Sequence, residues 1–147
     1  MNEASRGVIE VSFDTGWFGC LLFTSDRLII ARTEQKRYET DGGLLMEYIS
    51  RRIDIKVRRE GEQRRLTYMT MHPDNILAAD DKNLALPYSE VEKVEMKKPG
   101  RVWAGKVTIK TTTRERAYRY PLREGKEAFD RHVNLVRSFL PDKLIVA

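Results

Sequence analysis

The stretch from Asn83 to Leu140 constrains the fold most, because it carries a series of strand signals followed by one helix signal. An apolar run beginning at Leu84 meets Pro87, turns through Tyr88-Ser89-Glu90 and resumes with apolar residues on one side from Val91. Proline and the polar residues after it favour a tight turn over a continuous strand. This segment therefore predicts two short strands joined at a tyrosine-containing turn.

The second half of the same stretch predicts a hairpin and a closing helix. Residues 106–111 alternate apolar and polar side chains, residues 112–115 are polar, and the chain returns through residues 117–120. From Glu124 onward the apolar residues recur at spacings of three and four, which is one face of a helix, and Pro141 follows as a stop. The apolar positions are Ala128, Phe129, Val133, Val136 and Leu140.

The N-terminal part predicts three strands of a first sheet. Residues 7–13 alternate in the manner of a half-buried strand, and residues 17–24 are apolar on both faces, which is typical of a central strand that also buries Trp17 and Phe18. A turn at residues 25–26 leads into the third strand, residues 27–32. Charge and glycine over residues 32–43 then indicate a connection.

The region between the two strand groups predicts a helical insertion at about 42–80 into one domain that spans residues 1–147. Apolar residues at 45, 49, 53 and 57 repeat at four and favour a helix with arginines on its other side. The alternative is a hairpin over residues 57–68, since Ile53-Asp-Ile-Lys-Val also alternates. We favour the helix, with Gly61 near its end or at a break, and a second short helix from Pro73.

Two segments resemble prokaryotic pleckstrin-homology-like domains, the bacterial PH and GRAM-like group. They are Leu84-Ala-Leu-Pro-Tyr-Ser-Glu-Val-Glu-Lys-Val, within the C-terminal strand and helix region, and Leu22-Phe-Thr-Ser-Asp-Arg-Leu-Ile-Ile-Ala, which looks like the first hairpin. The resemblance implies an α+β fold, a PH-like partly open antiparallel β-barrel or sandwich capped by a C-terminal helix. It also implies a non-enzymatic function, because such domains bind lipids, peptides or other domains. It supplies no ligand residues.

Composition fits a globular protein of ordinary domain size. The 147 residues carry a formal net charge of +5, but the 27 basic residues are mixed with 22 acidic ones, which is more typical of a solvated surface than of a binding field. Cys20 is the only cysteine and lies in an apolar run, so we expect a buried thiol in a reducing compartment. No leader-like segment or membrane-spanning run is present, and we expect a cytoplasmic location.

No constellation of catalytic residues or metal ligands is recognisable. The two histidines, His72 and His132, lack a second histidine or cysteine at ligand spacing, and a helix start and a packed helix position explain them better. Asp80-Asp81 lacks the spacing of a calcium loop and is typical of a solvated turn. We therefore expect no metal, no cofactor and no enzymatic activity.

Basic clusters are the most function-like feature of the sequence. Arginine pairs recur six or seven residues apart in the insertion, so a helix would bring them within about two turns of one another. A second cluster lies in a loop before Trp103, where a basic turn beside an aromatic residue suits a lipid phosphate. Solvated surface charge is the commoner explanation for both clusters. The candidate residues are Arg51, Arg52, Arg58, Arg59, Arg64 and Arg65 in the first cluster and Lys97, Lys98 and Arg101 in the second.

Three function classes follow from these features. The preferred hypothesis is an interaction module that binds a protein partner or a second copy of the chain. The alternative is binding of anionic lipid headgroups at a membrane surface. Nucleic-acid binding through the arginine pairs ranks below both, because no row of stacking aromatics accompanies them.

Overall fold

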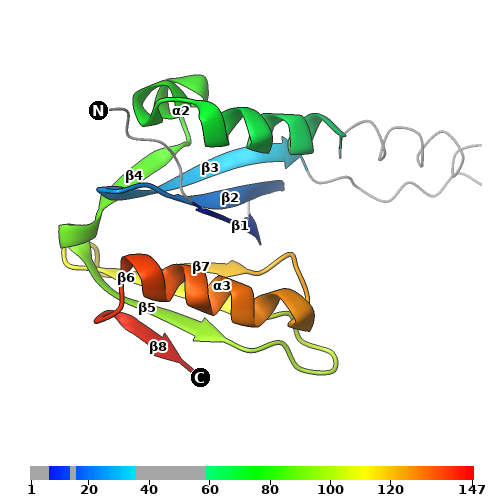
Figure 1. Ribbon diagram of the computed structural model, residues 1–147, viewed down its shortest axis with the longest axis vertical. Coiled ribbons are helices and arrows are strands. Elements are labelled where there is room, and N and C mark those ends of the chain that lie inside the picture. Colours follow the sequence, from blue (N-terminus) through cyan, green and yellow to red (C-terminus); the bar gives the residue numbers. More distant parts are fainter. Residues whose placement is uncertain (1–6, 14–15, 36–58) are drawn as a thin grey trace, which may run out of the picture.

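The protein is α+β and is built from two four-stranded sheets. A computed structural model of the chain describes residues 7–13, 16–35 and 59–147. The strand orders are β1-β2-β3-β4 and β7-β6-β5-β8, and every pairing is antiparallel except that of β5 with β8. Figure 1 shows the sheets as two layers. The described strands confirm the α+β class, but they form two separate sheets and do not close into a barrel.

The first sheet contains one strand more than the sequence predicted. Its strands are β1 (Gly7–Ser12), β2 (Trp17–Phe23), β3 (Arg27–Gln35) and β4 (Leu84–Pro87). β4 pairs with β3 across the whole insertion, which local sequence patterns do not reveal. β3 also continues past the predicted end into residues assigned to a connection. Glu34, the charged residue of this extension, pairs with Arg123.

The second sheet begins at the predicted tyrosine turn. That turn is the 3₁₀ helix η1 (Tyr88–Glu90), followed by β5 (Val91–Lys97), β6 (Lys106–Thr111) and β7 (Tyr118–Pro121). The predicted hairpin is confirmed as β6 and β7. A fourth strand, β8 (Leu144–Val146), pairs in parallel with β5 and was not predicted, because three residues carry too little alternation to be recognised.

The C-terminal helix α3 (Lys126–Phe139) completes the core between the sheets, as its apolar spacing predicted. Phe129, Val133 and Val136 are buried in one cluster with the inward-facing residues of both sheets. Phe23 of β2 stacks on Phe139 with ring centroids 5.6 Å apart. Gly7 also lies against Leu135, where an added Cβ would come within 2.2 Å of that side chain. The helix therefore packs on both sheets.

Two helices cover the outer face of the first sheet, as Figure 1 shows. Residues 59–70 are helical, and α2 (Pro73–Ala79) follows with His72 as its N-cap, as predicted. The hairpin alternative is wrong from residue 59 onward. Gly61 lies inside the helix, where an added Cβ would come within 2.7 Å of Glu34. The apolar positions 45, 49, 53 and 57 lie outside the described residues, and no described helix is long and apolar enough to span a membrane.

Burial on both sides explains the continuous apolar sequence of β2. Cys20 and Leu22 face a second cluster formed with Tyr68 and Ile76 of the outer helices. Leu21 and Phe23 face the main core. Because both faces are covered, the strand lacks the polar alternation of a half-exposed strand.

Truncation of Phe129 tests the packing of α3. Phe129 is 3% exposed, so Phe129→Ala should lower the free energy of unfolding by about 3 to 5 kcal/mol. Arg137→Ala, on the exposed side of the same helix, is the control and should change it little. Chemical denaturation measures both. An unchanged midpoint for Phe129→Ala would show that α3 does not complete the core.

The thiol of Cys20 tests the second cluster. Cys20 is fully buried, and burial raises its pKa to about 12. Because the thiolate is the reactive form, labelling near pH ~8 should require opening of the outer helices and proceed far more slowly than in denaturant. The rate of thiol-reagent labelling checks this. Rapid stoichiometric labelling of the native protein would contradict it.

Candidate functional site

Aromatic and basic side chains from four separated segments line one cavity, which we call the aromatic–basic pocket. Its volume is about 550 Å³. The β1–β2 turn, β3, the start of β4 and the β6–β7 hairpin each contribute to its wall. The lining residues are Phe13, Trp17, Ile30, Arg32, Lys82, Leu84, Arg114 and Tyr120.

Arg32 and Trp17 form one wall of the pocket. The Arg32 guanidinium carbon lies 3.8 Å from the centroid of the Trp17 ring, within cation–π range. Its Nε is 3.4 Å from Asp80 Oδ2 and makes no hydrogen bond within the described part of the chain. The backbone N–H of Arg32 donates to Asn83 Oδ1 at 2.8 Å. The arginine is thus held in place, with its Nε beside the Asp80 carboxylate.

Gly19 leaves room for the Phe13 ring, which lines the pocket. The register between β2 and β3 shifts between Phe18 and Gly19. The Phe13 ring lies over Gly19, where an added Cβ would come within 2.1 Å of the ring. From that position Phe13 meets Tyr120 edge to face, with ring centroids 5.0 Å apart. Gly19 is therefore required for the aromatic floor of the pocket.

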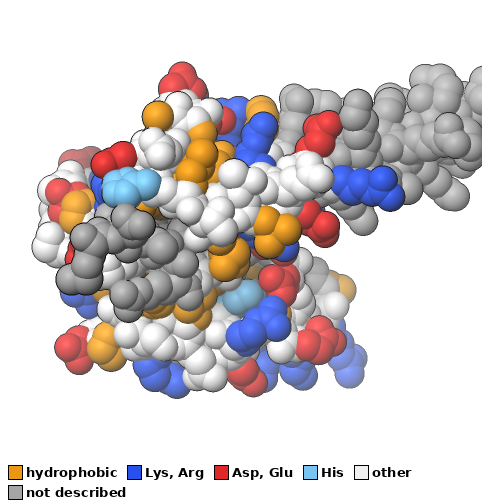
Figure 2. Space-filling view, turned by 45° about the horizontal axis from the view of Figure 1, so that its top comes forward, with side chains coloured by type: hydrophobic (Ala, Val, Ile, Leu, Met, Phe, Trp, Pro, Cys, Tyr) orange, Lys and Arg blue, Asp and Glu red, His pale blue; other side chains and the backbone are white. Residues whose placement is uncertain are grey.

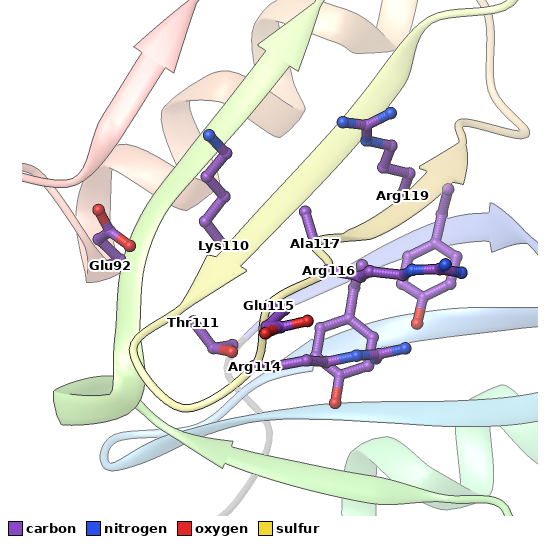
Figure 3. A pocket seen from close by; sticks show the side chains of 10 residues that line it. Glu92, Lys110, Thr111, Arg114, Glu115, Arg116, Ala117 and Arg119 are labelled. Carbon is purple, nitrogen blue, oxygen red and sulfur yellow. The ribbon is translucent and has the colours of Figure 1, made fainter.

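The β6–β7 turn joins this pocket to a larger polar one. The second cavity, of about 900 Å³, shares Arg114 and Tyr120 with the first and contains both acidic and basic residues. Arg114 lies 4.0 Å from the centroid of the Tyr118 ring. Figure 3 shows the side chains of Arg114, Glu115 and Arg116 gathered at the turn, with Glu92 and Lys110 farther along the sheet. The two cavities therefore adjoin at Arg114 and Tyr120 of the hairpin.

The structure separates the two predicted basic clusters. Lys97, Lys98 and Arg101 are all exposed: Lys97 is the last residue of β5, and the other two lie on the predicted loop between β5 and β6. Arg51, Arg52 and Arg58 lie outside the described residues. Arg59 and Arg64 are exposed on the outer helix, whereas Arg65 pairs with Glu10 of β1 and does not join a free stripe. On the face drawn in Figure 2, basic and acidic side chains are interspersed.

Ion pairs connect the first sheet to the helix at residues 59–70, which we call the outer helix, and to the segment after β7. Arg65 pairs with Glu10, and Arg123 pairs with Glu34, whose side chain is only 5% exposed. The Arg123 guanidinium also lies 3.7 Å from the centroid of the Phe18 ring. Trp17 and Phe18 are therefore half-buried under arginines, whereas the sequence predicted burial within the sheet. These contacts stabilise the fold and leave the aromatic–basic pocket as the candidate site.

Sequence patterns did not identify the pocket residues. Arg32, Lys82 and Arg114 lie far apart in the chain and looked like ordinary surface charge. The alternation of Tyr118 and Tyr120 around an arginine was the one local signal, because it places two aromatic rings on the same face of β7. Within the described part of the chain, no group of three or more His, Cys, Asp or Glu residues could hold a metal ion.

Comparison with protein-family models, curated proteins and solved structures gave no match for this chain. The case for a function therefore depends on the geometry and charge of the surfaces described above.

His132 provides a pH-dependent test of the packing of α3. His132 is 2% exposed. Burial lowers its pKa below 6.5. The Glu124 carboxylate, whose Oε1 is 3.8 Å from Nε2 of His132, has a smaller and opposite effect on this pKa. The unfolded chain therefore binds a proton at higher pH than the folded one. Stability should be full above the unfolded pKa and fall as pH drops from ~7 towards ~5.

Thermal unfolding across this range, compared with a His132→Gln variant, measures the histidine contribution. As pH falls, the stability of the variant should decrease less than that of the parent protein, because glutamine does not titrate. An identical pH dependence in both proteins would mean that His132 is not buried in its neutral form.

Proposed function

We propose that the protein is a non-enzymatic PH-like interaction module, located in the cytoplasm, that binds an acidic segment of a partner protein in the aromatic–basic pocket. The observation that carries this proposal is the convergence of Arg32, Lys82 and Arg114 around the aromatic rings of Trp17 and Tyr120. Carboxylates attract such guanidinium and ammonium groups, and the aromatic lining offers apolar contact to a neighbouring side chain of the partner.

The dimensions and charges favour a polypeptide over a small anion. A cavity of about 550 Å³ holds a few side chains, and it shares Arg114 and Tyr120 with the larger polar cavity around the β6–β7 turn. That second cavity is lined by both signs of charge, with basic residues in excess: Lys110, Arg114, Arg116 and Arg119 against Glu92 and Glu115. A peptide segment can present acidic residues to both cavities and a basic or neutral residue beside Glu92 and Glu115.

The two-sheet architecture with a capping helix supports the PH-like assignment, since it agrees with the resemblance of the two segments described above. Nucleic acid ranks below a protein partner, because Arg65 is engaged by Glu10 and does not extend an arginine stripe. A second copy of the chain would have to offer an acidic segment to the same pocket.

Selection from a library of short random displayed peptides tests the proposal. We expect enrichment of peptides that combine Asp or Glu with an aromatic residue. Lys82→Glu with Arg114→Glu should weaken binding of a selected peptide by at least about tenfold, or ~1.4 kcal/mol, because both cations are replaced by anions.

The matched control is Lys126→Glu with Arg137→Glu, which reverses two exposed cations of α3. It should leave peptide affinity nearly unchanged in the same fluorescence-anisotropy titration. Enrichment without acidic bias, or equal weakening by both double variants, would show that the aromatic–basic pocket does not select an acidic segment.

A further inference from the structure

The β5–β6 loop carries two large apolar side chains that are exposed to solvent. Val102 is 84% exposed and Trp103 is 75% exposed, more than the other large hydrophobic residues exposed in the described part of the chain. Lys97, Lys98 and Arg101 flank them and are also exposed. The loop shares no residue with the aromatic–basic pocket.

The loop is held in shape by its own contacts. The N–H of Gly100 donates to the carbonyl of Trp103 at 3.0 Å, and the indole packs over Gly100, with an ideal Cβ there 3.4 Å from Trp103 Cδ1. At the base, Gly105 is so closely packed that an added Cβ would lie 3.1 Å from Pro99. The loop thus closes on itself through the backbone of Trp103, and the indole remains exposed.

β8 adds apolar surface beside the base of the loop. Ile145 and Val146 are 44% and 47% exposed, and β8 pairs in parallel with β5, the strand that leads into the loop. The N–H of Lys98 lies 3.4 Å from the carbonyl of Ala147. Exposed apolar and basic groups thus occupy neighbouring positions at this end of the second sheet.

We propose that this loop docks on an anionic bilayer surface, with Val102 and Trp103 entering the interfacial region and Lys97, Lys98 and Arg101 meeting lipid phosphates. Tryptophan favours the boundary between headgroups and acyl chains, because its ring is apolar and its N–H is polar. Basic residues beside it are attracted by the negative potential of anionic lipids.

The small size of the apolar tip favours a bilayer over a protein partner. A specific protein interface buries roughly 800 Å² on each partner, which a tip of two side chains does not supply. Shallow insertion of a few apolar groups supported by basic residues is sufficient for reversible membrane binding. Charge complementarity therefore selects an anionic membrane as the occupant.

Vesicle sedimentation at low salt tests this proposal with two probes, phosphatidylcholine vesicles and vesicles that also contain phosphatidylserine. Binding to the anionic vesicles should exceed binding to the neutral ones by about tenfold or more and decline with added salt. Val102→Ser with Trp103→Ser should reduce anionic binding by about tenfold, and so should the triple change of Lys97, Lys98 and Arg101 to Gln.

Matched controls use exposed residues elsewhere. Leu66→Ser removes an apolar side chain that is 58% exposed on the outer helix, and Arg59→Gln with Arg64→Gln and Lys126→Gln removes three exposed cations. Both controls should stay within about twofold of the parent protein. Because every substituted side chain is exposed, thermal unfolding should confirm that all variants fold.

Fluorescence reports insertion directly. Brominated anionic lipid should quench the emission that Trp103 contributes, defined as the difference between the parent and a Trp103→Phe variant. Three results would overturn the proposal: no binding to anionic vesicles at low salt, full binding by the Val102 and Trp103 double variant, or equal losses in the controls. None of these results depends on the aromatic–basic pocket, so its failure as a peptide site would be seen separately.

Discussion

The joint at Tyr88 determines how the two sheets meet. Its hydroxyl donates to the carbonyl of Thr24 at 2.6 Å, its N–H donates to the carbonyl of Asp26 at 3.3 Å, and its carbonyl accepts from Lys143 Nζ at 2.6 Å. The Thr24 hydroxyl in turn closes the β2–β3 turn through Arg27. One residue thus connects the first sheet, the start of the second and the segment after α3. The Pro-Tyr turn predicted from the sequence therefore has a structural role, because its tyrosine joins the two sheets.

The contacts of Tyr88 hold the two sheets together, so residues that are distant in the sequence can line one pocket. A second connection is the isolated antiparallel bridge between Val11 of β1 and Leu122, which follows β7. Because the sheets are connected at both places, Arg32 of β3 and Arg114 of the β6–β7 turn line the same cavity. Arg32 lies over the Trp17 ring and pairs with Asp80, whereas Arg114 lies over the Tyr118 ring and is exposed. An anionic partner would therefore meet exposed Lys82 and Arg114 and compete with Asp80 for Arg32.

Local patterns were sufficient to predict most strands, α2, α3 and the α+β class. β1 and α3 bury one regular face, β2 is a continuous apolar run because both its faces are covered, and α2 begins at Pro73. Local patterns failed where the structure depends on distant partners. β4 joins β3 across the insertion, and Gly61 lies within a helix at a point where Glu34 of β3 leaves no room for a side chain. The same distinction between local and distant partners applies to the two candidate binding surfaces. The exposed β5–β6 loop could be predicted from its local residues, whereas the aromatic–basic pocket could not, since its cations come from separate segments.

The central claim is that the chain carries two separate binding surfaces, each marked by one of its two tryptophans. Trp17 lines the pocket, and Trp103 stands on the loop. The most direct measurement is a ¹⁵N spectrum of the two indole N–H groups during titration with a Glu-rich peptide containing one phenylalanine, and separately with small anionic bicelles. The account predicts that the peptide shifts the Trp17 resonance alone and the bicelles shift the Trp103 resonance alone. Movement of both resonances with one probe, or a silent Trp17 at saturating peptide, would contradict it.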